Sequence, residues 1–217
     1  ITVNTVNDAP LITSNGGGAT AVDSVAENQT TVTTVTSTDV DGGAAVYTIT
    51  GGADQTLFSI SATTGALTFN AAPNFESPAD AGSNNVYDVT VQVADGNGGT
   101  ASQSLAVTVT NANEVPVITS AATVSVAENQ TSAITVTSTD VDGGTPTYSI
   151  TGGADQALFS INSSTGVLTF NAAPNFEAPA DAGTNNVYDV TVQVADGNGG
   201  TVSQAIAITV TNVNETP

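Results

Sequence analysis

The chain has 217 residues, and its most distinctive property is its charge. It contains 20 Asp plus Glu and no Lys, Arg or His, so its formal net charge at pH 7 is −20. Such a chain repels nucleic acids and anionic membranes, which argues against both as partners. The absence of Cys excludes disulfides and thiolate metal sites, and no apolar run is long enough to predict a membrane span.

An internal repeat determines the expected domain organisation. Ser24 aligns with Ser125 and Pro116 with Pro217 without a gap, and most aligned positions carry the same residue. A repeat of about 100 residues has the size of a small domain with its own core. We therefore expect residues 1–8 to be the tail and linker of a preceding repeat, 9–115 a first repeat and 116–217 a second. Because the chain begins inside a strand-like pattern without a signal peptide, we interpret it as part of a longer protein.

Alternating apolar and polar residues predict the secondary structure. In the first repeat the expected strands cover 22–26, 33–38, 46–50, 57–61, 66–70, 86–94 and 102–110. The clearest alternation places Tyr87, Val89, Val91 and Val93 on one face, and no segment shows a helical period. Asn15–Gly18, which the second repeat lacks, is expected to be a loose loop. The predicted fold is all-β, with two tandem seven-stranded Greek-key β-sandwiches.

Strands that alternate in direction place successive loops at opposite ends of a sandwich. We call the end where the first strand begins the entry end, and the end where the last strand finishes the exit end. The acids gather at these ends. The first exit end has Glu27 and Glu76, the linker has Asn111, Asn113 and Glu114, and the second entry end has Asp140, Asp142 and Asp196. The same pattern predicts Asn7, Asp8, Asp39, Asp41 and Asp95 at the first entry end, and Glu128 and Glu177 at the second exit end.

Gathered carboxylates without basic partners predict a cation site. Ca²⁺ takes six to eight hard oxygen ligands, and the exit end, linker and following entry end together offer that number. Without a cation, carboxylates held this close together would repel one another. The alternative is that these acids only solvate loops and form Asp-Gly turns. Asp23, Asp54 and Asp88 lie outside the set and are expected to be surface charge.

An ordered set of short motifs resembles the cadherin repeat. The motifs are Val25-Ala26-Glu27-Asn28, Asp39-Val40-Asp41, Phe58-Ser59-Ile60, Gly65-Ala66-Leu67, Asn74-Phe75-Glu76, Ala94-Asp95-Gly96 and Val6-Asn7-Asp8-Ala9-Pro10. The insertion Pro78–Gly82 is similar to that of bacterial cadherin-like repeats. Such repeats occur in tandem in large calcium-dependent bacterial adhesins, including RTX-type and biofilm adhesins.

The resemblance implies roles for the clustered acids. Glu27 corresponds to the base glutamate, Glu76 to the glutamate of the acidic triplet, and Asn113 and Glu114 to the linker motif. Asp140 and Asp142 match the paired aspartates of the next repeat, and Asp196 matches the further aspartate at the entry end of that repeat. Asn74 and Asn111 replace aspartates of the family pattern, and the asparagine that follows the paired aspartates is missing. One or two ions at each joint are therefore expected, with Asp80 as a further candidate ligand.

The chain offers little for catalysis. It has no His, Lys or Cys to act as base or nucleophile, and no Trp to form a sugar-binding platform beside a carboxylate pair. We therefore do not expect an enzyme. The resemblance implies instead calcium-stiffened stalk repeats on the bacterial surface or in a secreted protein. The partners expected are the adjacent repeats of the same chain, and the isolated chain is expected to be a monomer. The alternative function is calcium-dependent binding of polysaccharide or of like domains on another cell.

Overall fold

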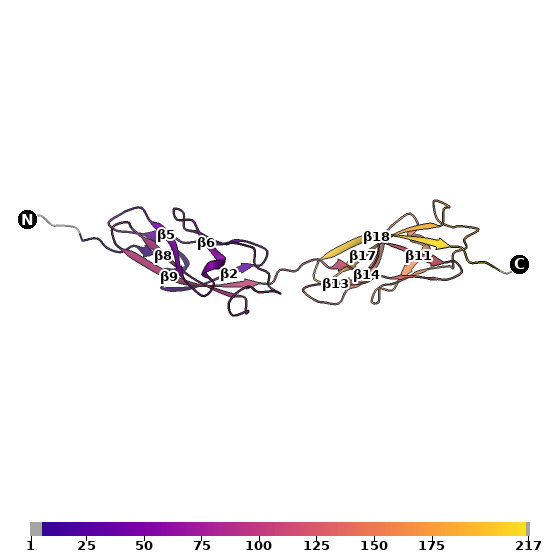
Figure 1. Ribbon diagram of the computed structural model, residues 1–217, viewed down its shortest axis with the longest axis horizontal. Helices are drawn as coiled ribbons and strands as arrows, with labels where there is room; N and C mark the ends of the chain where they lie inside the picture. Colours follow the sequence, from indigo (N-terminus) through magenta and orange to yellow (C-terminus); the bar gives the residue numbers. More distant parts are fainter. Residues whose placement is uncertain (1–5, 216–217) are drawn as a thin grey trace, which may run out of the picture. The chain divides into compact units, whose positions relative to one another are not determined.

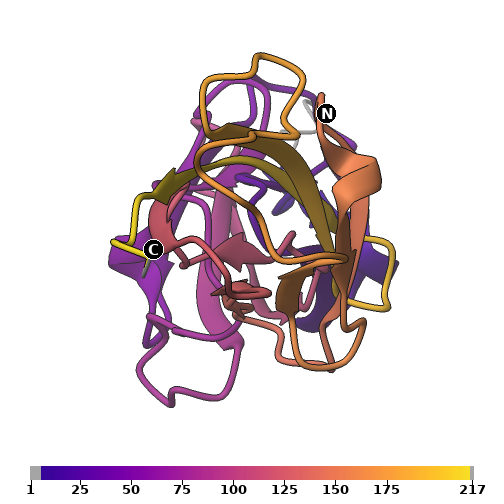
Figure 2. The same ribbon diagram turned by 90° about the vertical axis from the view of Figure 1, so that its right-hand side faces the viewer.

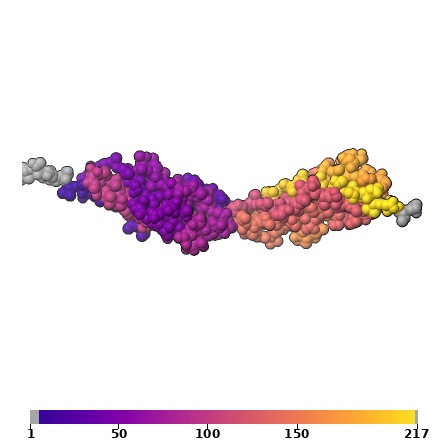
Figure 3. Space-filling model, viewed as in Figure 1, coloured from indigo at the N-terminus to yellow at the C-terminus, as the bar shows by residue number. Residues whose placement is uncertain are grey.

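The computed structural model describes residues 6–215, and the chain divides into two compact units, Ile1–Ala112 and Asn113–Pro217. Each unit is a separately packed body of atoms (Figure 3), and we call them the first and second repeat. Of the expected tail and linker in residues 1–8, residues 1–5 lie outside the described residues, and the division into 1–8, 9–115 and 116–217 stays a proposal. Among residues 6–215 no helix has the length and apolar character that crossing a membrane requires.

Strands and short 3₁₀ turns form each repeat, without an α-helix among the described residues (Figure 1). The first repeat contains β1 (Leu11–Ile12), η1 (Ser14–Gly17), β2 (Thr20–Ala26), β3 (Thr31–Thr34), β4 (Ser37–Thr38), β5 (Val46–Gly51), η2 (Gln55–Leu57), β6 (Phe58–Ile60), β7 (Ala66–Phe69), β8 (Val86–Ala94) and β9 (Thr100–Thr110). The second contains β10 (Val117–Ile118), β11 (Thr123–Ala127), β12 (Ser132–Thr135), β13 (Ser138–Thr139), β14 (Thr147–Gly152), η3 (Gln156–Leu158), β15 (Phe159–Ile161), β16 (Val167–Phe170), β17 (Val187–Ala195) and β18 (Thr201–Thr211).

Both repeats have the same sheet topology, which confirms the predicted sandwich fold. The first has a four-stranded sheet in the order β2-β9-β8-β5 and a three-stranded sheet in the order β3-β7-β6. The second has β11-β18-β17-β14 and β12-β16-β15, and Figure 2 views this repeat from the side of its C-terminus. The first two strands of each repeat are interrupted, so that β1 pairs with β4 while β2 pairs in parallel with β9. Counting each interrupted strand once gives the seven expected.

The core lies where the inward side chains of the two sheets meet, as the alternation predicts. Tyr87, Val89, Val91 and Val93 of β8 are buried, whereas Asp88, between Tyr87 and Val89, is exposed. The ring of Phe69 packs 4.5 Å from that of Phe58 and edge-on, at 5.1 Å, against Tyr87. The second repeat has an equivalent core with Phe159, Phe170 and Tyr188 in the same arrangement.

Two expectations about individual segments are wrong. The Asn15–Gly18 insertion is anchored rather than loose, because the fully buried Gln103 donates from Nε2 to the Gly18 carbonyl oxygen at 2.8 Å. Asp54 is buried rather than surface charge, with only 3% of its surface exposed. Its two oxygens accept the N–H groups of Ala81, at 2.7 Å, and Asp88, at 2.8 Å. A buried carboxylate is tolerated there because backbone donors bind both of its oxygens.

Candidate metal sites

The first entry end gathers its predicted residues into a hydrogen-bonded group, which we call the first entry cluster. Its members are Asn7, Asp8, Asp39, Asp41 and Asp95. The Asn7 side-chain amide donates to Asp95 Oδ2 at 2.8 Å, and the Asp8 N–H donates to Asp41 Oδ2 at 2.6 Å. Asp39 Oδ1 accepts the Asp41 N–H at 2.8 Å, which closes a turn between the paired aspartates. The linker that precedes β1 is therefore held against the loops that follow β4 and β8.

The second entry end repeats this geometry with the residues that sequence alignment predicts. The second entry cluster contains Asn113, Glu114, Asp140, Asp142 and Asp196. Asn113 Nδ2 donates to Asp196 Oδ2 at 2.8 Å, and the Glu114 N–H donates to Asp142 Oδ2 at 2.7 Å. Asp140 Oδ1 accepts the Asp142 N–H at 3.0 Å. The same donor pattern therefore occurs at both entry ends.

Within residues 6–215, an aspartate of each entry cluster has a side-chain oxygen that is shielded from solvent and has no hydrogen-bond partner. These oxygens are Asp39 Oδ2 and Asp140 Oδ2. Asp39 borders a hollow of about 60 Å³ together with Pro10 and Asp95, and Asp140 borders one of about 130 Å³ with Pro116 and Asp196. A buried, ionisable oxygen without a donor is costly, so each hollow has the chemistry of a cation site.

The hydrogen bonds in the entry clusters favour the ionised carboxylates. The side-chain amide of Asn7, followed by the N–H of Asn97, holds the pKa of Asp95 below its ordinary value of 3.8. In the second entry cluster the amide of Asn113 is the main cause of a lowered pKa for Asp196. Both groups are therefore negatively charged at any pH above their ordinary range.

Sequence reasoning missed two residues of the entry clusters, Gly99 and Gly200. A Cβ at Gly99 would lie 2.9 Å from the Ala9 Cα and 3.0 Å from the Asp8 carbonyl oxygen. A Cβ at Gly200 would lie 3.0 Å from the Glu114 carbonyl oxygen and would overlap Asp196 Oδ2. The linker can approach the loop only because these positions lack a side chain. The sequence signal was the run Asp-Gly-Asn-Gly-Gly, which occurs once in each repeat.

The first exit end has a cluster centred on Glu27, which is 1% exposed. Glu27 Oε2 accepts the Phe75 N–H at 2.8 Å and Oε1 accepts the Ala112 N–H at 2.9 Å. Glu76 accepts from the Asn111 amide at 3.0 Å, and an oxygen of Glu76 lies within 4.8 Å of an oxygen of Glu27. Glu27, Glu76 and Asn111 form the first exit cluster, which also binds the start of the linker.

The second exit cluster is equivalent. Glu128 is 1% exposed and accepts the N–H groups of Phe176, at 2.8 Å, and Val213, at 2.9 Å. These two hydrogen bonds, with Phe176 the larger cause, hold the pKa of Glu128 below its ordinary value of 4.5. Asn212 donates to Glu177 at 2.5 Å. Each repeat thus carries acidic groups at both ends, while the sharing of ions between successive repeats stays a prediction.

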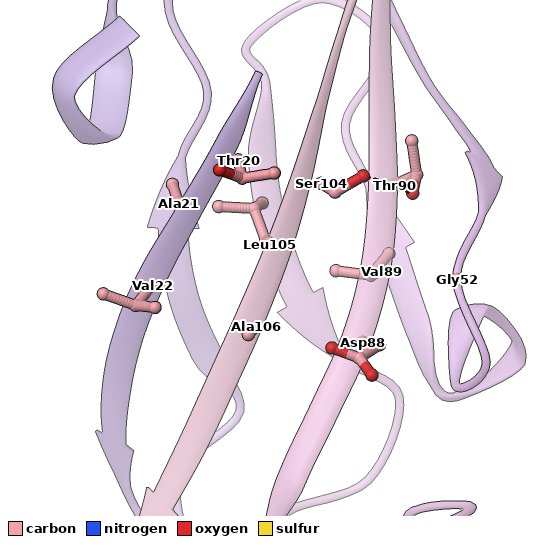
Figure 4. A pocket seen from close by; sticks show the side chains of 10 residues that line it. All are labelled: Thr20, Ala21, Val22, Gly52, Asp88, Val89, Thr90, Ser104, Leu105 and Ala106. Carbon is pink, nitrogen blue, oxygen red and sulfur yellow. Dashed lines mark hydrogen bonds between the residues drawn. The ribbon is translucent and has the colours of Figure 1, made fainter. Parts of the chain in front are cut away.

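A further hollow, of about 560 Å³, lies on the first repeat's four-stranded sheet, away from both clusters (Figure 4). Its lining comes from the beginning of β2, from the middle of β8 and β9, and from Gly52, and the side chains are mostly small. It presents the hydroxyls of Thr20, Thr90 and Ser104 and the carboxylate of Asp88, with no aromatic ring. Aromatic rings are the usual platform for sugar recognition, so this hollow does not by itself favour the polysaccharide alternative.

The sheets and acidic ends together define a tandem β-sandwich protein of the immunoglobulin-like class. More narrowly, the chain belongs to the bacterial Ig domain family, whose model matches residues 7–108 and 113–209. The comparison with curated proteins found no match.

Solved cadherin structures have a similar fold. Human protocadherin-24 EC1-2 (form II) is 20% identical, with a TM-score of 0.60, and the match covers 95% of this chain and 100% of that chain. Mouse cadherin-23 EC22-24 is 19% identical, with a TM-score of 0.57 and coverage of 95% and 68%. Human CDH23 EC21-23 is 19% identical, with a TM-score of 0.52 and coverage of 95% and 70%. At such identities the likeness shows a cadherin-like fold.

Proposed function

We propose that these repeats are calcium-stiffened extender segments of an extracellular bacterial adhesin. The observation that carries this proposal is the pair of shielded, unpartnered oxygens, Asp39 Oδ2 and Asp140 Oδ2, each inside a cluster of further oxygen donors. The chain has no Lys, Arg or His, so a neutralising charge has to come from outside the protein. Clustered carboxylate and amide oxygens are ligands for Ca²⁺, whereas transition metals favour nitrogen and sulfur ligands.

The short connection between the repeats supports a mechanical role. Ala112 donates its N–H to Glu27 of the first repeat, and the next residue, Asn113, donates its amide to Asp196 of the second. No unattached residue separates the two anchored positions, so the linker has few free torsion angles. Glu27, Glu76, Asn111, Asn113, Glu114, Asp140, Asp142 and Asp196 are the proposed ligands of this joint. Bound calcium would neutralise their repulsion and thereby restrict the remaining rotation.

The two repeats carry the same residue at most aligned positions. Near-identical neighbours are typical of a repeated mechanical part, whereas a recognition site would more often lie in one distinctive domain. β9 and β18 have 11 residues each, and at about 3.4 Å per residue they span roughly 35 Å. Each added repeat therefore lengthens a chain by several nanometres. The four tyrosines are buried within the two cores. They are therefore not available as exposed aromatic contacts, which often dominate recognition surfaces.

Thermal unfolding with and without calcium tests the proposal. We expect millimolar Ca²⁺ to raise the melting temperature over that in chelator, because a ligand of the folded state alone stabilises it by about 2.7 kcal/mol at 100-fold excess over its dissociation constant. Mg²⁺ at the same concentration should act less, since it demands a tighter octahedral site. Asp140→Asn should reduce the calcium-induced shift. Asp189→Asn removes the same charge from an exposed strand position outside the clusters and should leave the shift unchanged.

Superimposed melting curves in calcium and chelator would show that the clusters bind no calcium. The role of these repeats needs a separate measurement, namely a polysaccharide binding panel beside sedimentation at high protein concentration, both in millimolar calcium. Monomers that retain no polysaccharide are expected of extender segments. Specific retention or calcium-dependent self-association would instead establish the alternative, a polysaccharide-binding or homophilic adhesion module.

A further inference from the structure

Two loops at the entry ends contain an Asn-Gly pair. The sequence has three such pairs, at Asn15, Asn97 and Asn198, and the last two occupy equivalent loops after β8 and β17. Asn97 and Gly98 are exposed, as are Asn198 and Gly199. We propose that Asn97 and Asn198 are sites of spontaneous deamidation, and that their conversion damages the adjoining entry clusters.

The loop geometry favours the reaction at Asn97. No described acceptor binds the N–H of Gly98, and glycines stand on both sides of Asn97. Gly96 and Gly98 have φ values of 80° and 107°, and a Cβ at either would meet open space, so nothing packs against these two glycines. Because glycine adopts many backbone conformations, the loop can bring the Gly98 nitrogen to the Asn97 side chain at small cost.

Asn15 is a natural comparison within the same chain. It lies inside η1, where its φ of 51° and ψ of 40° are left-handed. Its Nδ2 is shielded from solvent, and its Oδ1 accepts from Thr33 Oγ1 at 3.4 Å. Gln103 further holds this segment by its bond to Gly18. An anchored backbone and side chain slow cyclisation, so the Asn-Gly pair at Asn15 should react more slowly than the other two.

The reaction needs only water and a solvent base. The base takes the Gly98 amide proton, the nitrogen attacks Asn97 Cγ, and the bond from Cγ to Nδ2 breaks with release of ammonia after proton transfer to the leaving group. Water then opens the five-membered imide at either carbonyl. One product is aspartate, and the other is isoaspartate, in which the main chain runs through the former side chain and gains a methylene. No electrons are exchanged with an external reagent.

The isoaspartate product would disturb the entry cluster through Asp95. Asp95 Oδ1 accepts the N–H groups of Asn97, at 2.7 Å, and Gly99, at 3.0 Å, so the spacing of these donors along the chain orients the carboxylate. An additional main-chain carbon between them changes that spacing. Asp196 accepts the corresponding N–H groups of Asn198 and Gly200. Isoaspartate at position 198 would therefore disturb the second entry cluster in the same way. This consequence rests on the proposed calcium function, whereas the modification itself does not.

Peptide mapping by mass spectrometry tests the modification without reference to calcium. The intact 217-residue protein is incubated at mildly alkaline pH, and amide-to-acid conversion is followed over time at each asparagine. We expect conversion at Asn97 and Asn198 to be several-fold faster than at Asn15 and at the exposed Asn70, which precedes Ala71. Equal rates at all four positions, or faster conversion at Asn15, would overturn the proposal.

A variant separates the modification from its consequence. The double variant Asn97→Ser, Asn198→Ser keeps the backbone N–H donors but cannot form the imide. Aged wild-type protein is expected to lose part of its calcium-induced melting shift, while the aged variant keeps the shift of the fresh variant. Conversion with no loss of shift would refute the damage to the clusters. If fresh wild-type protein shows no calcium shift at all, the proposed function fails while the mapping result still decides the modification.

Discussion

At the scale of single residues, this protein uses backbone N–H groups where most proteins use basic side chains. The buried carboxylates of Glu27 and Asp54 each accept two backbone N–H groups, and Glu128 repeats the pattern. Hydrogen bonds to an ionised group are stronger than those between neutral groups. They also leave the total charge uncompensated, because a backbone donor contributes no formal positive charge. Acidic side chains can therefore stabilise the fold inside a repeat, while those at its ends are candidate ligands for a cation.

Replacing Asp54 tests the structural use of a buried carboxylate. Asp54→Asn should destabilise the first repeat by about 1–3 kcal/mol, because the amide NH₂ cannot accept one of the two N–H groups that Asp54 binds. Urea unfolding followed by circular dichroism measures this change. Asp88→Asn, an exposed change of the same charge, is the control and should change stability little. A stability equal to that of the wild type would mean that the Asp54 contacts are not required.

Replacing Gly200 tests the close approach of the linker to the loop. Gly200→Ala places a Cβ against Asp196 and the Glu114 carbonyl oxygen, so we expect a smaller calcium-induced melting shift. Gly197→Ala is a useful comparison, since its Cβ would meet open space, although its φ of 89° adds backbone strain. Isothermal titration with calcium gives the affinity of each variant directly. Unchanged affinity in Gly200→Ala would place the ion away from this contact.

At the scale of elements, the loops and linkers carry the candidate sites while the strands only position them. The sheets place the loops after β4 and β8 at the same end as the linker, which brings Asp39, Asp41 and Asp95 to Asn7 and Asp8. The strands themselves present mostly Thr, Ser and Val. Substitutions in the clusters should therefore affect ion binding and acid sensitivity more than the fold.

The acid dependence of stability belongs to these loops. Asp95, Asp196 and Glu128 have lowered pKa values, so each contributes stability that is present above its unfolded pKa and is lost as pH falls through its lower folded pKa. In chelator we expect these groups to contribute a decrease in unfolding free energy below about pH 4.5, where the unfolded state begins to bind more protons. Urea unfolding over a pH series measures the decrease. Asp196→Asn should make it shallower, and an identical slope would contradict the assigned contacts.

At the scale of the whole molecule, the charge of −20 on 217 residues opposes the compact state. Screening should relieve this repulsion even without calcium. In chelator we expect the melting temperature to rise from low salt to 1 M NaCl, because the Debye length falls from about 30 Å at 0.01 M to about 3 Å at 1 M. The same salt series in millimolar calcium should show a smaller rise, since bound ions would already neutralise the clusters. A melting temperature that falls with NaCl in chelator would mean that self-repulsion does not limit stability.

The sequence by itself determined the all-β class, the repeat and the inward faces of the strands. Period-two alternation is local information, so the burial of Tyr87, Val89 and Leu67 could be predicted from neighbouring residues alone. The sorting of acids to the ends followed from strand alternation, and the structure brings Asn7 to Asp95 and Asn113 to Asp196 as hydrogen-bonded pairs. The predictions of the fold class and of the buried faces succeeded because each depended on one strand or on the order of strands, while ion binding by the acids stays a prediction.

Only the tertiary structure distinguished the roles of similar acids. Asp54 and Asp88 look alike in sequence, yet one is buried and the other exposed, because the loop that contains Ala81 folds over Asp54 and donates to it. The same holds for Gln103, which is buried by the insertion, while its counterpart Gln204 is only half-buried in the repeat that lacks it. Burial of a polar side chain depends on donors that are distant in sequence, and these become neighbours only when the chain folds.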